Sequence, residues 1–309
     1  MGKLFKIKKG QNLKNIRYVG YACINSTLSE VKNKSDKVFT SRTLRKSSFN
    51  LNAVSELIRK NVGDLKTIME WNAEHNIHLF RVSSDVFPFI DHPDLKYELS
   101  ALKDYEYIVN TMSEIGSIAN SNDIRITSHP GPYNCLGSPN DDTVYKTILC
   151  LNNHAIIGGL LSSKDFVINI HVGGSYGGEF DETANRFCSN FEGLNENAKK
   201  WLTIENDDKS SMWSVTKLYG FIHSKIKIPI ILDTHHWQFC NEETLEEAAE
   251  ICFSTWGNRF PKIHYSESAF GKRPQAHSDF IEGPLPVFKG EYDVMVEAKK
   301  KELAILPFI

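Results

Sequence analysis

Histidine and carboxylate residues recur where short apolar segments of this chain come to an end. The apolar, β-prone run from Trp201 to Ile204 leads into Glu205, and acidic and amide residues follow where a strand would not continue. Three further apolar runs end on residues of the same kind, namely His129, His171 and Asp233. Imidazole and carboxylate groups together suit zinc, manganese or iron. The spacing therefore predicts a metal site built from the ends of several strands.

Eight residues have the type and the position of metal ligands: His129, His171, Glu205, Asp233, His236, His264, His277 and Glu297. A single histidine at a strand end is more often a hydrogen-bonded structural residue, and the i, i+3 pair of Asp233 and His236 is only suggestive. Convergence of many such residues is different, because three uncompensated carboxylates would repel one another and raise one another's pKa. Divalent cations relieve that repulsion, so we expect these residues to bind metal.

These ligands need a framework that brings distant strand ends together. Apolar runs and turn residues predict eight strands, at residues 16–23, 77–82, 124–128, 166–171, 201–205, 230–233, 262–265 and 293–297. Helical patterns fall between them, at about residues 51–74, 100–121, 142–161, 183–197, 214–225 and 243–254. Gly63 and Asp64 are a point at which the first of these helices is expected to break, and a basic helix is expected to begin at Lys299.

The alternation of strands and helices predicts an α/β protein with parallel strands. Eight such units fit a single (β/α)8 TIM barrel, with the active site at the C-terminal ends of the strands. A doubly wound sheet is the alternative, but it requires a glycine-rich loop after the first strand, and residues 21–25 do not form one. We assign residues 16–309 to the barrel domain and residues 1–15 to a basic N-terminal tail.

Composition narrows the range of partners and compartments. The chain of 309 residues has 36 Lys and Arg against 38 Asp and Glu, so any nucleic-acid contact must be a local patch. Six cysteines without a C-x-x-C pair, in a chain without a secretion signal, predict reduced thiols. No apolar run reaches membrane-spanning length. We expect a soluble intracellular monomer, cytoplasmic or nuclear if the cell is eukaryotic, with no membrane contact and no obligate protein partner.

The segments around the ligand candidates resemble, in order and spacing, the successive signatures of UV damage endonucleases. The resemblance covers about residues 16–302. The motifs that carry it are Val19-Gly20-Tyr21-Ala22-Cys23-Ile24-Asn25, Phe80-Arg81-Val82-Ser83-Ser84, Ser128-His129-Pro130-Gly131, Ile170-His171-Val172-Gly173-Gly174, Ile204-Glu205-Asn206-Asp207, Leu232-Asp233-Thr234-His235-His236, Lys262-Ile263-His264-Tyr265-Ser266, Ala276-His277-Ser278-Asp279-Phe280 and Val296-Glu297-Ala298-Lys299.

The resemblance implies a metal-dependent DNA repair endonuclease, related in fold to endonuclease IV. Such enzymes cut on the 5′ side of cyclobutane pyrimidine dimers and 6-4 photoproducts, leave a 3′-hydroxyl and a 5′-phosphate, and in many cases also act at abasic sites. The implied cofactors are up to three divalent ions, manganese first, with zinc, magnesium or cobalt as alternatives. The implied partner is damaged double-stranded DNA.

Carried over by motif, the resemblance assigns three metal positions and two catalytic residues. The first metal would be held by His129, His171 and Glu205, the second by Glu205 as a bridge with Asp233, His264 and Glu297, and the third by His236 and His277. Glu205 and Lys262 would be catalytic. Lys262 matches a position at which relatives carry a carboxylated lysine, and from the sequence alone we expect an unmodified lysine here.

The resemblance also implies residues that contact the lesion. The expected lesion contacts are Tyr21, Asn25, Pro132 and Tyr133. Tyr21 and Tyr133 match DNA-contacting positions of the family, and packing at the strand end is the alternative role for Tyr21. The family pattern has glutamine after His-Pro-Gly, whereas this chain has Pro132, which leaves the catalytic pattern intact and changes the means of lesion recognition. Phosphate contacts are expected from Lys209, Lys272 and Arg273, for which the alternative is a solvated surface charge.

Two other functions use similar residues. A sugar isomerase or epimerase on a related metal-dependent barrel would need one or two metals in a narrow pocket, and would have no role for His236 and His277 as a pair. A module that binds damaged DNA without cutting it would not need the complete ligand set. Nicking of a UV-irradiated duplex in the presence of manganese separates these three functions.

Overall fold

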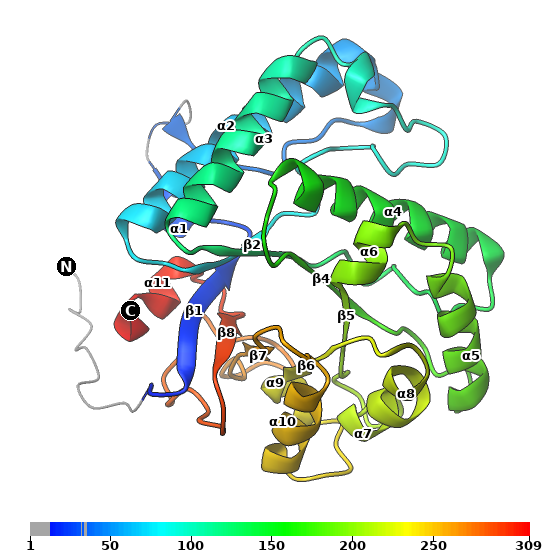
Figure 1. The fold of residues 1–309 in the computed structure, drawn as a ribbon. Coiled ribbons are helices and arrows are strands. Elements are labelled where there is room, and N and C mark those ends of the chain that lie inside the picture. Colours follow the sequence, from blue (N-terminus) through cyan, green and yellow to red (C-terminus); the bar gives the residue numbers. More distant parts are fainter. Residues whose placement is uncertain (1–12, 32, 34–35) are drawn as a thin grey trace.

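The structure is a computed structural model that describes residues 13–31, 33 and 36–309, so most of the expected N-terminal tail lies outside the described residues. Its centre is a closed barrel of eight parallel strands in sequence order, with helices packed around it, as Figure 1 shows. The strands are β1 (Ile16–Ala22), β2 (Leu79–Val82), β3 (Arg125–Ser128), β4 (Val167–His171), β5 (Leu202–Glu205), β6 (Ile230–Asp233), β7 (Lys262–Tyr265) and β8 (Tyr292–Val296). The predicted TIM barrel is confirmed.

Helices cover the outside of the barrel because each long helix turns one apolar stripe toward the strands. The α-helices are α1 (Ser26–Ser29), α2 (Leu51–Glu74), α3 (Tyr105–Ser121), α4 (Asp141–Leu160), α5 (Phe180–Phe191), α6 (Glu196–Trp201), α7 (Val215–Lys217), α8 (Ser224–Ile226), α9 (Thr234–Trp237), α10 (Leu245–Ser254) and α11 (Glu302–Ile305). A π-helical segment at Leu218–His223 joins α7 to α8. Short 3-10 turns lie at Lys46–Ser48, Leu99–Ala101 and Leu306–Phe308.

Three expected helices differ from the structure, two within the chain and one near its end. Helix α2 is unbroken at Gly63 and Asp64, and the Asp64 carboxylate accepts hydrogen bonds from Phe39 N and Arg42 Nη2, both at 2.7 Å. The helix expected over residues 183–197 is two helices, since Asn195 caps a new one by accepting from Ala198 N at 2.8 Å.

The basic segment at the end of the chain does not begin a helix at Lys299. Lys301 has a left-handed φ of 51°, and α11 begins only at Glu302. The buried carboxylate of Glu302 accepts hydrogen bonds from Ser26 N and Thr27 N, both at 2.7 Å. The last helix therefore fastens the loop after β1 at the C-terminal end of the barrel.

The N-terminal end of the barrel is closed by a network of arginine and aspartate side chains. Asp293 is fully buried and is paired with Arg17 at 2.6 Å and Arg125 at 2.7 Å. Asp165 is paired with Arg125 at 2.6 Å and with Arg259 at 2.8 Å. Each of the two carboxylates thus contacts two guanidinium groups. The negative charges at this end of the barrel are therefore compensated by arginine side chains of the protein.

The predictions about membrane-spanning segments and about cysteine pairing can be compared with the described residues. None of the helices among them is long and apolar enough to cross a bilayer. All six cysteines lie in the described part of the chain and are free.

Candidate metal centre at the C-terminal end of the barrel

Six successive strands, β3 to β8, each deliver a candidate ligand to the same end of the barrel. His129 follows β3, and His171, Glu205 and Asp233 are the last residues of β4, β5 and β6. His264 lies within β7 and Glu297 follows β8. Because parallel strands all end at one rim, residues far apart in the sequence meet there.

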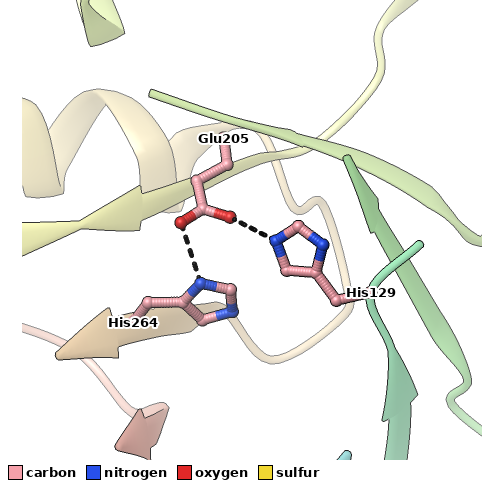
Figure 2. Close-up of side chains that lie close together, drawn as sticks. All are labelled: His129, Glu205 and His264. Atoms are coloured by element: carbon pink, nitrogen blue, oxygen red, sulfur yellow. Dashed lines mark hydrogen bonds and ion pairs between the residues drawn. The ribbon is translucent and has the colours of Figure 1, made fainter. Parts of the chain in front are cut away.

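Glu205 is at the centre of this group and is 1% exposed. Its carboxylate oxygens lie 2.9 Å from His264 Nδ1 and 3.2 Å from His129 Nε2, and Figure 2 shows the two imidazoles on either side of the carboxylate. His236 Nδ1 and His171 Nε2 are 3.6 Å and 3.9 Å from the same carboxylate. The expected bridging position of Glu205 therefore corresponds to a carboxylate shared by four imidazoles.

Three overlapping groups in the described part of the chain bring their ligand atoms within 4.8 Å of one another: His129, Glu205 and His264; His171, Glu205 and His236; and Asp233, His264 and Glu297. Seven of the eight expected ligands are in these groups. They differ in grouping from the expected sets, since His236 joins His171 and Glu205. The ring of His236 is oriented by a contact between its Nδ1 and Asn206 O at 3.0 Å, and its backbone N donates to Asp233 Oδ1 at 2.9 Å.

His277 is the ligand candidate that these groups do not include. It lies on the segment after β7, with Nδ1 3.8 Å from Glu297 Oε2 and its ring centroid 5.6 Å from that of His235. The expected grouping of His236 with His277 is therefore not reproduced, because His236 turns to Glu205 while His277 faces Glu297 and His235.

The site balances its charges with imidazoles. Burial lowers the pKa of His171, but Glu205 and Asp207 outweigh burial and raise it to about 10. Burial raises the pKa of Glu205, yet the His264 and His171 imidazoles hold it well below its usual range. Burial is the main reason that the pKa of Asp233 rises to about 7. The nearby carboxylates also raise the pKa of His236 against burial, whereas burial lowers the pKa of His129 and lowers that of His264 to about 3. The proton on His171 thus compensates the buried carboxylates at neutral pH.

The donor set fits divalent cations. Asp233 Oδ2 is buried and has no hydrogen-bond partner among the described residues, which is costly unless a cation meets it. Imidazole nitrogens and carboxylate oxygens are ligands that zinc and manganese accept. Cations would also replace the imidazole protons that now face the carboxylates. Each of the three groups therefore offers the atoms that a metal requires.

Lys262, the second expected catalytic residue, begins β7 and is 1% exposed. Its Nζ has no hydrogen-bond partner among the described residues. Burial, and then the charges of Arg81 and Arg125, hold the pKa of Lys262 well below its usual range. Such an environment favours a neutral amine.

Two of the expected lesion contacts are buried in this structure. Tyr21 is 0% exposed, and its hydroxyl donates to Asn72 Oδ1 at 2.7 Å and accepts from Asn25 Nδ2 at 3.1 Å. Asn25 is 1% exposed and caps α1 by accepting from Leu28 N at 3.0 Å. Packing and capping thus already use the polar groups of Tyr21 and Asn25, and a contact of these residues with DNA stays a prediction.

The other two expected lesion contacts are exposed. Tyr133 is 87% exposed on the loop after β3, and Pro132 beside it is exposed as well. Asn134 fastens this loop, since its backbone N and its Nδ2 both donate to Gly131 O, at 3.2 Å and 2.9 Å. The loop therefore holds an aromatic ring outward within the sequence that follows His129.

Two further residues of the centre are absent from the expected set. Arg81 Nη2 lies 2.5 Å from Glu297 Oε1 and 3.0 Å from His264 Nε2, so it positions two candidate ligands. Asn169 Nδ2 donates to Glu205 Oε2. Arg81 and Asn169 are polar residues within otherwise apolar strands, and this break in the apolar pattern could have identified them in the sequence.

Comparison with known proteins agrees with this geometry. The chain matches the family described as UV-endonuclease UvdE over residues 17–309. It is 35% identical over 308 residues to the UV-damage endonuclease of Schizosaccharomyces pombe, a match that covers 93% of this chain and 49% of that protein. The chain thus spans about half the length of that relative.

Solved structures give the same result. The crystal structure of SacUVDE has a TM-score of 0.82 and 33% sequence identity, covering 94% of this chain and 96% of the other. Endonuclease IV from Thermus thermophilus has a TM-score of 0.54 at 13% identity, over 78% of this chain and 91% of the other, and shares the fold. Since the family match spans nearly all of the described residues, the chain belongs to the UV-endonuclease UvdE family.

Proposed function

We propose that this protein is a metal-dependent DNA repair endonuclease that nicks the damaged strand on the 5′ side of cyclobutane pyrimidine dimers and 6-4 photoproducts. The products would be a 3′-hydroxyl and a 5′-phosphate, and abasic sites would be a further substrate. The observation that carries the proposal is the convergence of six strand ends around the buried carboxylate of Glu205. We infer that residues 16–309 perform this function as one domain, as a monomer, and inside the cell.

The proposed cofactors are up to three divalent ions, with manganese first and zinc, magnesium and cobalt as alternatives. The residues that would hold them are His129, His171, Glu205, Asp233, His236, His264, His277 and Glu297. When bound, such ions supply positive charge that polarises a phosphodiester and makes water a stronger nucleophile. That charge would also let DNA phosphate approach an acidic centre in a protein of formal net charge −2.

The protein's own residues would orient this centre. The two oxygens of Glu205 face different imidazoles, which supports a role for this carboxylate in holding more than one cation. Arg81 holds Glu297 and His264 in position. Lys262 lies beneath the centre, where burial and the charges of Arg81 and Arg125 favour a neutral amine, and it would act as a catalytic residue in its unmodified form.

Recognition of damaged DNA would use the loop after β3. Tyr133 is exposed and can stack on a base that the lesion has unstacked. Pro132 fixes its own backbone and has no side-chain donor, so this loop would act by shape and stacking. Lys209, Lys272 and Arg273 are exposed and would contact phosphates.

The decisive test is incision of a labelled duplex. A duplex that carries a defined photoproduct, an abasic duplex and an intact duplex are incubated with the protein and manganese, and products are resolved at nucleotide resolution. We expect a nick on the 5′ side of the photoproduct, none in the intact duplex, and loss of nicking on chelation. A sugar epimerase or a non-cutting DNA-binding module would leave all three duplexes intact.

A further inference from the structure

Two large apolar side chains are far more exposed than any others among the described residues. Tyr133 is 87% exposed and Phe270 is 105% exposed, whereas the next, Val287, is 52% exposed. Tyr133 follows β3 and Phe270 follows β7. In a closed barrel of eight strands in sequence order, β3 and β7 are four strands apart and so lie on opposite sides of the mouth. The segments that carry the two rings therefore leave the barrel on opposite sides of the candidate metal centre.

Phe270 is carried by an antiparallel hairpin, residues 267–278. Ser268 and His277 form a bridge, Ala269 N donates to Ala276 O at 2.6 Å, and Ser278 N donates to Glu267 O at 2.8 Å. At the tip, Gly271 has a φ of 69°, a conformation that glycine adopts without strain. The exposure of Phe270 is thus a consequence of a regular, hydrogen-bonded turn.

The base of this hairpin is fixed to its surroundings. The Glu267 carboxylate accepts from Gly283 N at 2.7 Å, Glu282 N at 2.9 Å and Tyr265 Oη at 3.1 Å. Lys299 N donates to Ser278 O at 3.0 Å. Since both strands of the hairpin are held, the tip presents Phe270 to solvent at a defined place.

The tip also carries positive charge. Lys272 and Arg273 are exposed, and neither forms an ion pair within the part of the chain that the structure describes. The acidic groups nearer the base are already engaged, since Glu267 accepts backbone hydrogen bonds and Asp279 lies 3.6 Å from Lys299 Nζ. An exposed aromatic ring beside free cations is the combination that stacks on bases while tracking a phosphate backbone.

The hairpin is connected to the metal centre as well. His277 lies on its returning strand, with Nδ1 3.8 Å from Glu297 Oε2. A nucleic acid held at the tip would therefore be held at a fixed position relative to the candidate ligands.

We propose that Phe270 is a second stacking residue for distorted duplex DNA, acting across the mouth from Tyr133. Phe270 would stack on an unpaired or unstacked base, while Lys272 and Arg273 contact the flanking phosphates. The inference rests on the proposed function and adds to it a recognition element outside the His129 loop. Two rings on opposite sides of one centre would hold both edges of the distorted segment over the ligands.

The first test is the affinity for a photoproduct duplex, measured by fluorescence anisotropy in a Glu205→Gln background that prevents incision. Phe270→Ala should weaken binding by about tenfold, in line with the loss of one base–aromatic stack, and Phe270→Trp should restore it. Binding by Phe270→Ala with the affinity of the parent protein would overturn the proposal.

The second test does not depend on affinity. The indole of Phe270→Trp should be exposed in the free protein, and its emission should be quenched when the photoproduct duplex binds. Val287→Trp is the matched control, because Val287 is exposed on the loop that enters β8 at the opposite end of the barrel. Equal emission of Phe270→Trp with and without duplex would refute stacking. Failure of the proposed function is distinct, because it would appear as a wild-type protein that neither prefers nor nicks the photoproduct duplex.

Discussion

The two ends of the barrel treat buried charge in opposite ways. At the N-terminal end, Asp293 and Asp165 are each paired with two arginines, at 2.6 to 2.8 Å. At the C-terminal end, Glu205 and Asp233 face mainly imidazoles, and Glu297 is paired with the guanidinium of Arg81. Guanidinium groups keep their charge at every physiological pH, whereas imidazoles can lose theirs.

The arginine-paired carboxylates at the N-terminal end therefore contribute to stability, and the carboxylates at the C-terminal end are available for function. Permanent cations at the N-terminal end leave nothing for a ligand to neutralise there. Imidazoles at the C-terminal end can exchange their protons for metal ions, which would compensate the same carboxylates and also act on a substrate. Variants at the two ends should therefore fail in different assays.

The largest effect is expected from the shared carboxylate at the C-terminal end. Glu205→Gln keeps the shape of the side chain but removes the charge that four imidazoles surround. Incision should fall by much more than about a hundredfold, the upper range for loss of a residue that only supports a ligand. Gel-based nicking and binding of the same labelled duplex would be measured together, and binding should remain. Nicking at the wild-type rate would remove Glu205 from the centre.

The N-terminal end should respond in stability. Asp293→Asn leaves Arg17 and Arg125 without their shared buried carboxylate, which should lower the free energy of unfolding by about 3 to 5 kcal/mol. Denaturant unfolding measures this, and the metal content of the folded variant should equal that of the wild type. Glu114→Gln, which breaks the exposed pair with Lys66, is the matched control and should leave the free energy of unfolding almost unchanged, because solvent screens this pair. A loss of bound metal in Asp293→Asn would show that the two ends are coupled.

His154 is a buried imidazole with no carboxylate partner among the described residues, so it shows what burial does to a histidine. Burial, with a smaller effect from His129, lowers the pKa of His154 on α4 to about 4. As the pH falls below about 6.5, His154 takes up a proton in the unfolded chain but not in the folded protein. The free energy of unfolding is therefore highest above pH 6.5 and decreases as the pH falls toward 4. Wild type should lose about 2 to 3 kcal/mol more than His154→Gln between pH 7.5 and 4.5. Parallel pH profiles in denaturant unfolding would refute this.

The smallest effect is expected at the exposed loop of the C-terminal end. Tyr133→Ala should reduce photoproduct-dependent incision by about tenfold, because one stacking contact with a base is lost. Pro132→Gln should be tolerated or improve discrimination between lesions. Phe260→Ala, an aromatic at the N-terminal end that packs on Arg17, is the control and should nick normally. Wild-type nicking by Tyr133→Ala would show that this loop does not probe the lesion.

The sequence alone was sufficient for the barrel and for most of the side chains that the structure brings together in the candidate metal centre. Strand period, turn residues and the alternation with helices are local signals, so eight strands were placed within a few residues of their observed bounds. The ligand residues follow directly from that, because side chains at the ends of parallel strands must meet at one rim. Family resemblance supplied the same residues independently, from His129 to Glu297.

Only the tertiary structure decided which residues lie together in the candidate centre and which are buried elsewhere. Tyr21 and Tyr133 both lie in motifs that resemble the family. Packing against α2 buries Tyr21, whereas Tyr133 is exposed. Arg81 enters the centre, and His236 turns to Glu205 instead of His277, through contacts with residues distant in the chain. These outcomes depend on side-chain direction and on non-local neighbours, which residue type and spacing do not specify.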